Sequence, residues 1–146
     1  MKTYQEKRHF DKTPEPPWRD DQDKGQHRFV VQKHQAAHLH YDFRLEIGGV
    51  LQSWAVPKGP PLKPGVRRLA IKVEDHPVDY IDFAGEIPQG EYGAGSVEIW
   101  DKGEFDLKRE STDIVEFSLR GKKLSGSYAL IHTADKNWLF IRRKEV

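Results

Sequence analysis

The segment from residue 38 to residue 45 alternates polar and apolar side chains, and this pattern constrains the fold more than any other part of the chain. Every second position is polar (His38, His40, Asp42 and Arg44), and the positions between them are apolar (Leu39, Tyr41, Phe43 and Leu45). Successive side chains of a β-strand point to opposite faces, so the pattern predicts a strand. We expect its apolar face to line a hydrophobic core and its polar face to line a cleft.

Similar short runs, separated by turn residues, follow from residue 28 to the end of the chain. They predict strands over residues 28–33, 39–47, 50–56, 68–73, 96–100, 103–106, 114–119, 126–131 and 138–143. Gly48-Gly49 predicts a two-residue hairpin, and a second hairpin is expected at residues 101–103. Many short strands with almost no helix favour a closed antiparallel β-barrel or a sandwich, with surface loops between the strands.

The first 27 residues have a different character. Residues 3–6 fit a capping box and predict one short N-terminal helix that ends by Phe10, before the prolines of residues 14–17. Residues 18–26 are polar and predict a loop, in which Trp18 is the tryptophan expected to touch a ligand. We therefore expect residues 1–27 to form a helix and loop segment and residues 28–146 to form the barrel, within a single domain.

Composition excludes several classes of protein. The chain has no cysteine, which excludes disulfides, thiolate metal sites and a cysteine nucleophile. It has no apolar stretch of about 18 residues and no signal-peptide core, so we expect a cytoplasmic protein with no membrane partner. The net charge is +1, so basic clusters such as Arg67-Arg68 are interpreted equally as nucleic-acid contacts or as solvated strand ends.

The strongest candidates for a metal site are His34, His40 and Asp42. Two imidazoles and a carboxylate suit transition metals, the carboxylate favours Mn²⁺ or Fe²⁺, and three protein ligands leave open coordination positions for substrate. Arg44 follows on the same strand face and has no lone pair for a metal, so an anion is its expected partner. A solvated polar face without a metal remains the alternative interpretation, because antiparallel strands routinely alternate polar and apolar residues.

Further candidates lie downstream. His76 is interpreted as an acid or hydrogen-bond donor, or as a turn histidine, and Tyr80 follows four residues later. Lys58 is either a phosphate contact or a surface lysine. The glycine-rich residues 87–95 fit neither the Walker motif nor the dinucleotide fingerprint, and they precede a predicted strand. Trp54, Trp100 and Trp138 are expected in the core.

Several co-linear motifs resemble one known family. They are Gln32-Lys-His34, His40-Tyr-Asp-Phe-Arg-Leu-Glu46, and the segments 53–60, 74–77, 85–93 and 100–103. Together they look like the 3′-phosphoesterase domain of DNA ligase D, which also occurs as a free-standing protein. The resemblance implies a β-barrel with Mn²⁺-dependent activity on DNA or RNA–DNA 3′ ends of a primer–template duplex. The implied reactions remove 3′-terminal ribonucleosides and hydrolyse 3′-phosphate to 3′-OH during end-joining repair.

The resemblance also implies roles for individual residues. His34, His40 and Asp42 would hold Mn²⁺, or another divalent ion such as Co²⁺ or Zn²⁺. Arg44 and His76 would grip the scissile phosphate. Independently of the resemblance, a protonated His76 could stabilise the transition state or assist the leaving 3′-oxygen. The residues expected in support are Tyr80, Gln32 and Lys58, and those expected in ribonucleoside removal are Arg8 and Glu15. His9 departs from the family, which has Asp there, so the diesterase step is expected to be weaker.

Two alternatives from other classes stay open. One is an OB-like barrel that binds single-stranded nucleic acid without turnover. The other is an Fe²⁺ oxygenase that uses the same two histidines and carboxylate. No polymerase or ligase module is recognised in the sequence, so such partners are expected to be separate proteins.

Overall fold

Nine antiparallel strands and one short 3₁₀-helix make up the part of the chain that the computed structural model describes, residues 27–87 and 95–144. The elements are β1 (Arg28–Gln35), β2 (Leu39–Ile47), β3 (Val50–Val56), β4 (Arg67–His76), η1 (Val78–Asp82), β5 (Gly85–Ile87), β6 (Gly95–Glu110), β7 (Ile114–Arg120), β8 (Ser125–Ala134) and β9 (Asn137–Arg142). No helix among these described residues is long and apolar enough to cross a membrane.

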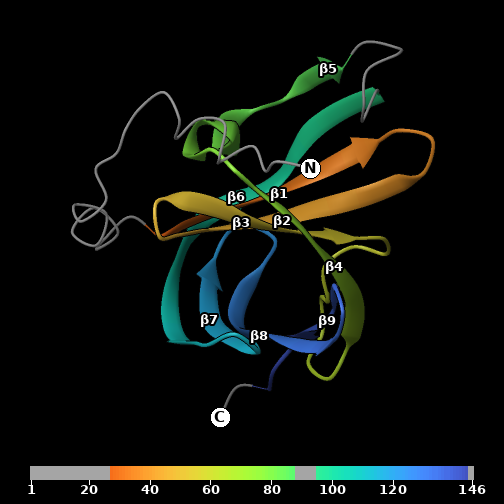
Figure 1. Ribbon diagram of the computed structural model, residues 1–146. Helices are drawn as coiled ribbons and strands as arrows, with labels where there is room; N and C mark the ends of the chain where they lie inside the picture. Colours follow the sequence, from red (N-terminus) through yellow and green to blue (C-terminus); the bar gives the residue numbers. More distant parts are fainter. Residues whose placement is uncertain (1–26, 88–94, 145–146) are drawn as a thin grey trace.

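The strands close into a barrel (Figure 1). Their order is β1-β2-β3-β4-β9-β8-β7-β6, and a further pairing of β6 with β1 completes the ring of eight strands. β5 pairs with the start of β6, so it lies outside this ring. The expectation of a mostly β protein with a closed antiparallel barrel is therefore confirmed. The expected N-terminal helix, Trp18 and residues 88–94 of the glycine-rich segment lie outside the described residues, and the division at residue 27 stays a prediction.

The two predicted hairpins have different outcomes. Ile47 pairs with Val50, and Gly48 and Gly49 both have positive φ, 71° and 83°, as a tight two-residue hairpin requires. The hairpin expected at residues 101–103 is wrong, because β6 runs through it without a break and continues to pair with β1. Gly103 serves close packing instead of a turn: a Cβ added there would lie 2.2 Å from the carbonyl oxygen of Arg120.

The inner face of the barrel holds the main hydrophobic core. Phe43 is fully buried at its centre, with its ring against those of Phe29, Trp54, Phe117 and Phe140. Trp54 and Trp138 are buried as expected, and Trp100 is partly buried against the same core. Leu39 is a correction: it is 48% exposed, because β2 begins there at the rim of the barrel and not over the core.

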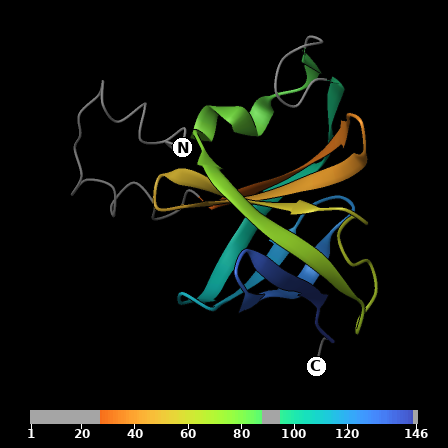
Figure 2. The same cartoon turned by 45° about the vertical axis from the view of Figure 1, so that its right-hand side comes forward.

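A second, smaller apolar cluster lies on the outer face of the barrel. Val30 from β1 and Leu51 from β3 pack there with Ile81 from η1. Figures 1 and 2 show η1 and β5 on this side of strands β1, β2 and β3, with β7, β8 and β9 on the opposite side. The 3₁₀-helix therefore covers the polar face of β2 that the sequence analysis identified.

Candidate active site

Strands β1 and β2 bring the three predicted metal ligands together. His34 lies directly opposite His40 in the antiparallel register, and Gln32 lies opposite Asp42. Because directly opposed residues point to the same side of a sheet, all four side chains share the outer face. The alternation seen in the sequence is thus confirmed from residue 40 onward. His38 does not belong to it, because it lies in the bend before β2.

The carboxylate of Asp42 lies between the two imidazoles. Its Oδ2 is 3.7 Å from Nδ1 of His34, and its Oδ1 is 3.3 Å from Nε2 of His40. One ligand atom from each residue can be chosen so that all lie within 4.8 Å of one another. Ligand atoms that share a transition metal lie roughly 3 to 4 Å apart, because each bond is about 2.1 Å long. The donor set and its spacing therefore fit one metal ion.

The protonation of this group follows from its contacts. The hydrogen bond to Asp42 is the main reason that the pKa of His40 is raised. Burial alone would raise the pKa of Asp42, but the contact with His40 and the charge of Arg44 outweigh it and lower the pKa. The other ring nitrogen of His40, Nδ1, lies 3.3 Å from the carbonyl oxygen of His38. With its proton on Nδ1, His40 presents Nε2 to a metal.

Arg44 lies beside Asp42, and only 4% of its surface is exposed. Its Nη2 is 3.5 Å from Oδ2 of Asp42, and its Nε donates a hydrogen bond of 2.7 Å to Oε1 of Gln32. Burial lowers the pKa of Arg44, but a guanidinium starts so high that it stays charged at neutral pH. The site therefore combines a fixed positive charge with a donor set that could hold a metal ion.

Gln32 connects the strand to the 3₁₀-helix. Its Oε1 accepts from Arg44, and its Nε2 donates 3.1 Å hydrogen bonds to the carbonyl oxygens of Tyr80 and Phe83. Gln32 is fully buried, so each of these bonds is costly to lose. The side chain orients the guanidinium and holds η1 over the site at the same time.

His76, at the end of β4, and Tyr80, in η1, complete the cluster. The His76 ring lies 4.8 Å from the Tyr80 ring, and the guanidinium carbon of Arg44 lies 4.9 Å from that ring. Nδ1 of His76 is 3.2 Å from Nη1 of Arg44 and 3.0 Å from the carbonyl oxygen of Glu74. Burial, and then the charge of Arg44, lower the pKa of His76 to about 4. His76 is therefore neutral at neutral pH, in contrast to the protonated form that the sequence analysis expected.

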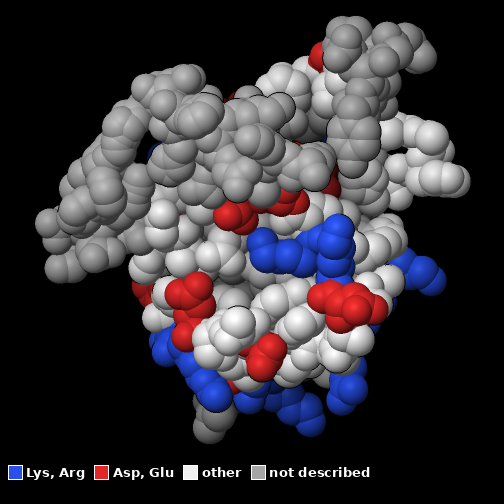
Figure 3. Space-filling view, viewed as in Figure 1, with Lys and Arg blue, Asp and Glu red and all other residues white. Residues whose placement is uncertain are grey.

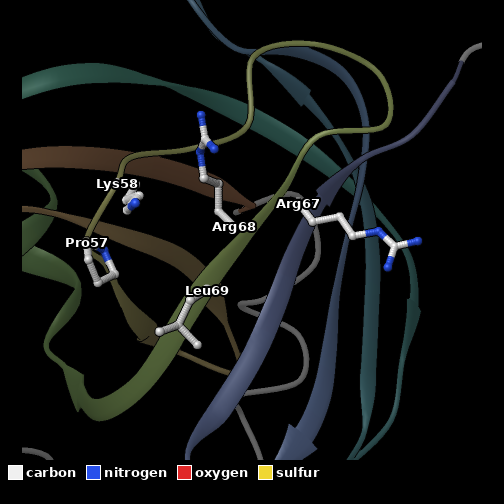
Figure 4. Close-up of a pocket in the computed structure, with 5 residues that line it drawn as sticks. All are labelled: Pro57, Lys58, Arg67, Arg68 and Leu69. Carbon is white, nitrogen blue, oxygen red and sulfur yellow. The ribbon is translucent and has the colours of Figure 1, made fainter.

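Lys58 lies in a different setting. It lines a surface pocket of about 290 Å³ together with Pro57, Arg67, Arg68 and Leu69 (Figure 4). Nε of Arg68 is buried there, with no hydrogen-bond partner among the described residues. Figure 3 shows both basic and acidic side chains on the face seen in Figure 1. Arg8 and Glu15 lie outside the described residues.

Sequence reasoning missed two features of the site. The first is Ile81, the buried residue of η1, and the second is the link from Gln32 to both Tyr80 and Phe83. Pro77, the residue that precedes η1, was a usable signal because proline is typical of helix starts. No local pattern indicates which strand the helix packs on.

Comparison with known proteins shows which family this sequence matches. The sequence model of the family described as the DNA Ligase D 3′-phosphoesterase domain matches residues 32–132. This range is more than half of the chain, and it includes every described side chain of the cluster. The chain belongs to this family. Arg8 and Glu15 precede the matched range.

Curated relatives of the chain support the same family assignment. The multifunctional non-homologous end joining protein LigD of Pseudomonas aeruginosa is 50% identical over 97% of this chain. The LigD protein of Mycobacterium tuberculosis strain H37Rv is 48% identical over 97%, and that of Mycolicibacterium smegmatis is 43% identical over 99%. The chain spans about a fifth of the length of these relatives, from 18% to 21%.

Proposed function

We propose that this protein is a metal-dependent phosphoesterase that heals DNA 3′ ends. It would remove 3′-terminal phosphate and 3′-ribonucleosides and leave a 3′-OH for repair and ligation. The observation that carries the proposal is the position of Asp42, whose carboxylate contacts two imidazoles and the guanidinium of Arg44. A metal set and a fixed cation side by side suit a phosphate ester, which carries negative charge on several oxygens.

His34, His40 and Asp42 would hold the metal. Their mixed nitrogen and oxygen donors favour Mn²⁺, with Co²⁺ or Zn²⁺ as further candidates. When bound, a divalent ion supplies Lewis acidity and neutralises phosphate charge at this point. The backbone carbonyl of His38 supports the site by fixing the ring of His40.

The neighbouring side chains would bind and orient the phosphate. Arg44 keeps its Nη groups toward Asp42 and His76, because Gln32 already engages Nε. A guanidinium in this position neutralises charge that develops on phosphate oxygens during ester cleavage. His76 and Tyr80 would take part on the same side, because the Tyr80 ring lies 4.8 Å from the His76 ring and 4.9 Å from the guanidinium carbon of Arg44. The basic pocket of Lys58 and Arg68 would contact phosphate in support.

The biological setting is proposed from the relatives, which are named for non-homologous end joining. The substrate would be a DNA or RNA–DNA 3′ end in a primer–template duplex. We propose that the chain prepares such ends, and that ligase and polymerase partners act on the 3′-OH that it produces.

The decisive test is phosphate release from a duplex that ends in a 3′-phosphate. The purified protein is treated with a chelator and assayed with Mn²⁺, with Fe²⁺ and without metal, alongside a duplex that ends in a 3′-ribonucleoside. We expect Mn²⁺-dependent phosphate release and removal of the ribonucleoside. Strand binding without release would support the OB-like alternative, and Fe²⁺-dependent oxygen uptake without release would support the oxygenase.

A further inference from the structure

The buried side chain of η1, Ile81, packs the helix against the outer face of the barrel. Ile81 is 2% exposed and packs with Val30 and Leu51, whose side chains are fully buried. This cluster is separate from the main core inside the barrel. The position of the helix therefore depends on a small local contact and not on the packing that stabilises the fold.

The rest of η1 offers little to hold it in place. The helix has five residues, and its backbone bonds run from Tyr80 N to Pro77 O and from Phe83 N to Tyr80 O. A 3₁₀-helix of this length does not maintain its own conformation in water. The ion pair of Asp82 with Lys102 joins η1 to β6, but both side chains are exposed, so it contributes little. Among the described residues, η1 is then held by the Gln32 amide, the ring contacts of Tyr80 and the buried side chain of Ile81.

The residue next to this anchor is Tyr80. Its ring contacts both groups proposed to grip the phosphate, at 4.8 Å from the His76 ring and 4.9 Å from the guanidinium carbon of Arg44. A shift of η1 moves this ring and both carbonyl oxygens that hold Gln32. The three metal ligands come from β1 and β2, so they do not depend on η1.

We infer that Ile81 is a positioning residue, which holds Tyr80 over Arg44 and His76 so that the phosphate side of the site is formed. This inference rests on the proposed phosphoesterase function. Loss of the Ile81 contact is therefore expected to affect the two parts of the site differently. Metal affinity should be retained, and turnover should fall.

Three variants test the inference. Ile81→Ala removes the anchor, Ile81→Val keeps most of it, and Ile47→Ala makes the same truncation in the main core, where Ile47 is 7% exposed. For each we would measure kcat and KM for 3′-phosphate release, Mn²⁺ affinity, and hydrogen exchange of the Tyr80 and Phe83 amides. All assays are run at a temperature where circular dichroism shows the variants folded.

For Ile81→Ala we expect kcat to fall about 10- to 100-fold, because small misplacements of positioned groups have effects of this size. Mn²⁺ affinity should stay within a factor of about two, and exchange should accelerate at Tyr80 and Phe83 but not in β7 or β8. Ile81→Val should recover most of kcat. Ile47→Ala should lower the melting temperature yet keep kcat near that of the unchanged protein.

Equal kcat values for Ile81→Ala and Ile47→Ala would overturn the inference. If Ile81→Ala does not fold, Ile81→Val decides: faster exchange confined to η1 with reduced kcat supports the anchor, and uniform exchange across the barrel refutes it. If the unchanged protein releases no phosphate with Mn²⁺, the proposed function fails, and the exchange data alone decide whether Ile81 anchors η1.

Discussion

At the scale of single residues, the site is organised around one buried carboxylate. Asp42 is 8% exposed and contacts His34, His40 and Arg44. A buried charge is stable only when it is paired, and the pairing here lowers the pKa of Asp42 in spite of its burial. The same carboxylate therefore contacts both the imidazoles proposed as metal ligands and the guanidinium.

The first prediction concerns the metal ligands. His40→Ala should lower Mn²⁺-dependent phosphate release by at least about 100-fold, because it removes one of three ligands to the ion that stabilises the reaction. Circular dichroism should show a folded barrel, since His40 lies on the outer face. His132→Ala is the matched control, because His132 lies on β8, a strand that contributes none of the residues proposed for the site. Retained release in His40→Ala would refute the assignment.

The second prediction separates the metal from the phosphate. Arg44→Ala should bind Mn²⁺ with unchanged affinity yet lose about 100-fold or more in turnover, because a guanidinium stabilises the reacting phosphate but cannot ligate a metal. Arg44→Lys should recover little, because an ammonium lacks the two-pronged geometry. Arg143→Ala, at an exposed arginine, serves as the control. Equal losses of Mn²⁺ affinity in Arg44→Ala and Asp42→Ala would contradict this division of roles.

The third prediction follows from the pKa of His76, which burial and Arg44 lower to about 4 from an ordinary value of 6.5. Between these two pH values the unfolded chain binds a proton that the folded chain does not, so the free energy of unfolding decreases as the pH falls. His76→Gln removes this contribution. Urea unfolding at pH 7, 6 and 5 should show a shallower loss of stability in the variant, and identical pH dependence would refute the prediction.

At the scale of the elements, β2 and β6 each connect two parts of the structure. β2 places Phe43 inside the barrel and Asp42 and Arg44 outside it. β6 pairs with β1 and β5 along its first half and with β7 along its second half. Its Asp101 is 5% exposed and accepts hydrogen bonds of 2.8 to 3.0 Å from the backbone amides of Lys122, Lys123 and Leu124. This carboxylate ties the β7–β8 connection to the middle of β6.

The fourth prediction concerns this connection. Asp101→Ala should lower the free energy of unfolding by on the order of 3 kcal/mol, because it leaves several backbone donors without their charged acceptor. Asp106→Ala, at an exposed carboxylate of the same strand, should have little effect. Urea unfolding measures both changes. A loss in Asp101→Ala no larger than that in Asp106→Ala would show that the carboxylate is dispensable.

At the scale of the whole molecule, the hydrophobic core and the candidate site lie on opposite faces of the same strands. The large core lies inside the barrel, and η1 lies over the outer face (Figure 2), where Gln32 donates hydrogen bonds to the carbonyl oxygens of Tyr80 and Phe83. Substitutions on the outer face therefore change the site without removing the core. Residues 1–26 lie outside the described part of the chain, and their role stays a prediction.

The fifth prediction tests that segment. Deletion of residues 1–20 should reduce removal of 3′-ribonucleosides far more than removal of 3′-phosphate, because the family resemblance places Arg8 and Glu15 in the first reaction. His9→Asp should raise the share of ribonucleoside removal. Both rates are measured at a temperature where the truncated protein is folded. A fall of both rates by the same factor would refute the prediction.

The sequence by itself determined those features that depend on neighbouring residues. Side chains alternate along any extended backbone, so the polar face that carries His40, Asp42 and Arg44 was predictable. The Gly48-Gly49 turn was predictable for the same local reason, since glycine adopts positive φ at low cost. The resemblance to the family added the expectation of a barrel and of a metal-ligand set.

Only the tertiary structure decided which distant segments meet. His76 reaches Arg44 because β3 pairs with both β2 and β4, and Ile81 reaches Val30 because η1 folds back over β1. The turn expected at residues 101–103 was wrong because Asp101 and Gly103 serve contacts with residues 120–124. Such contacts arise when the barrel closes, and local backbone preferences carry no information about which strands will pair.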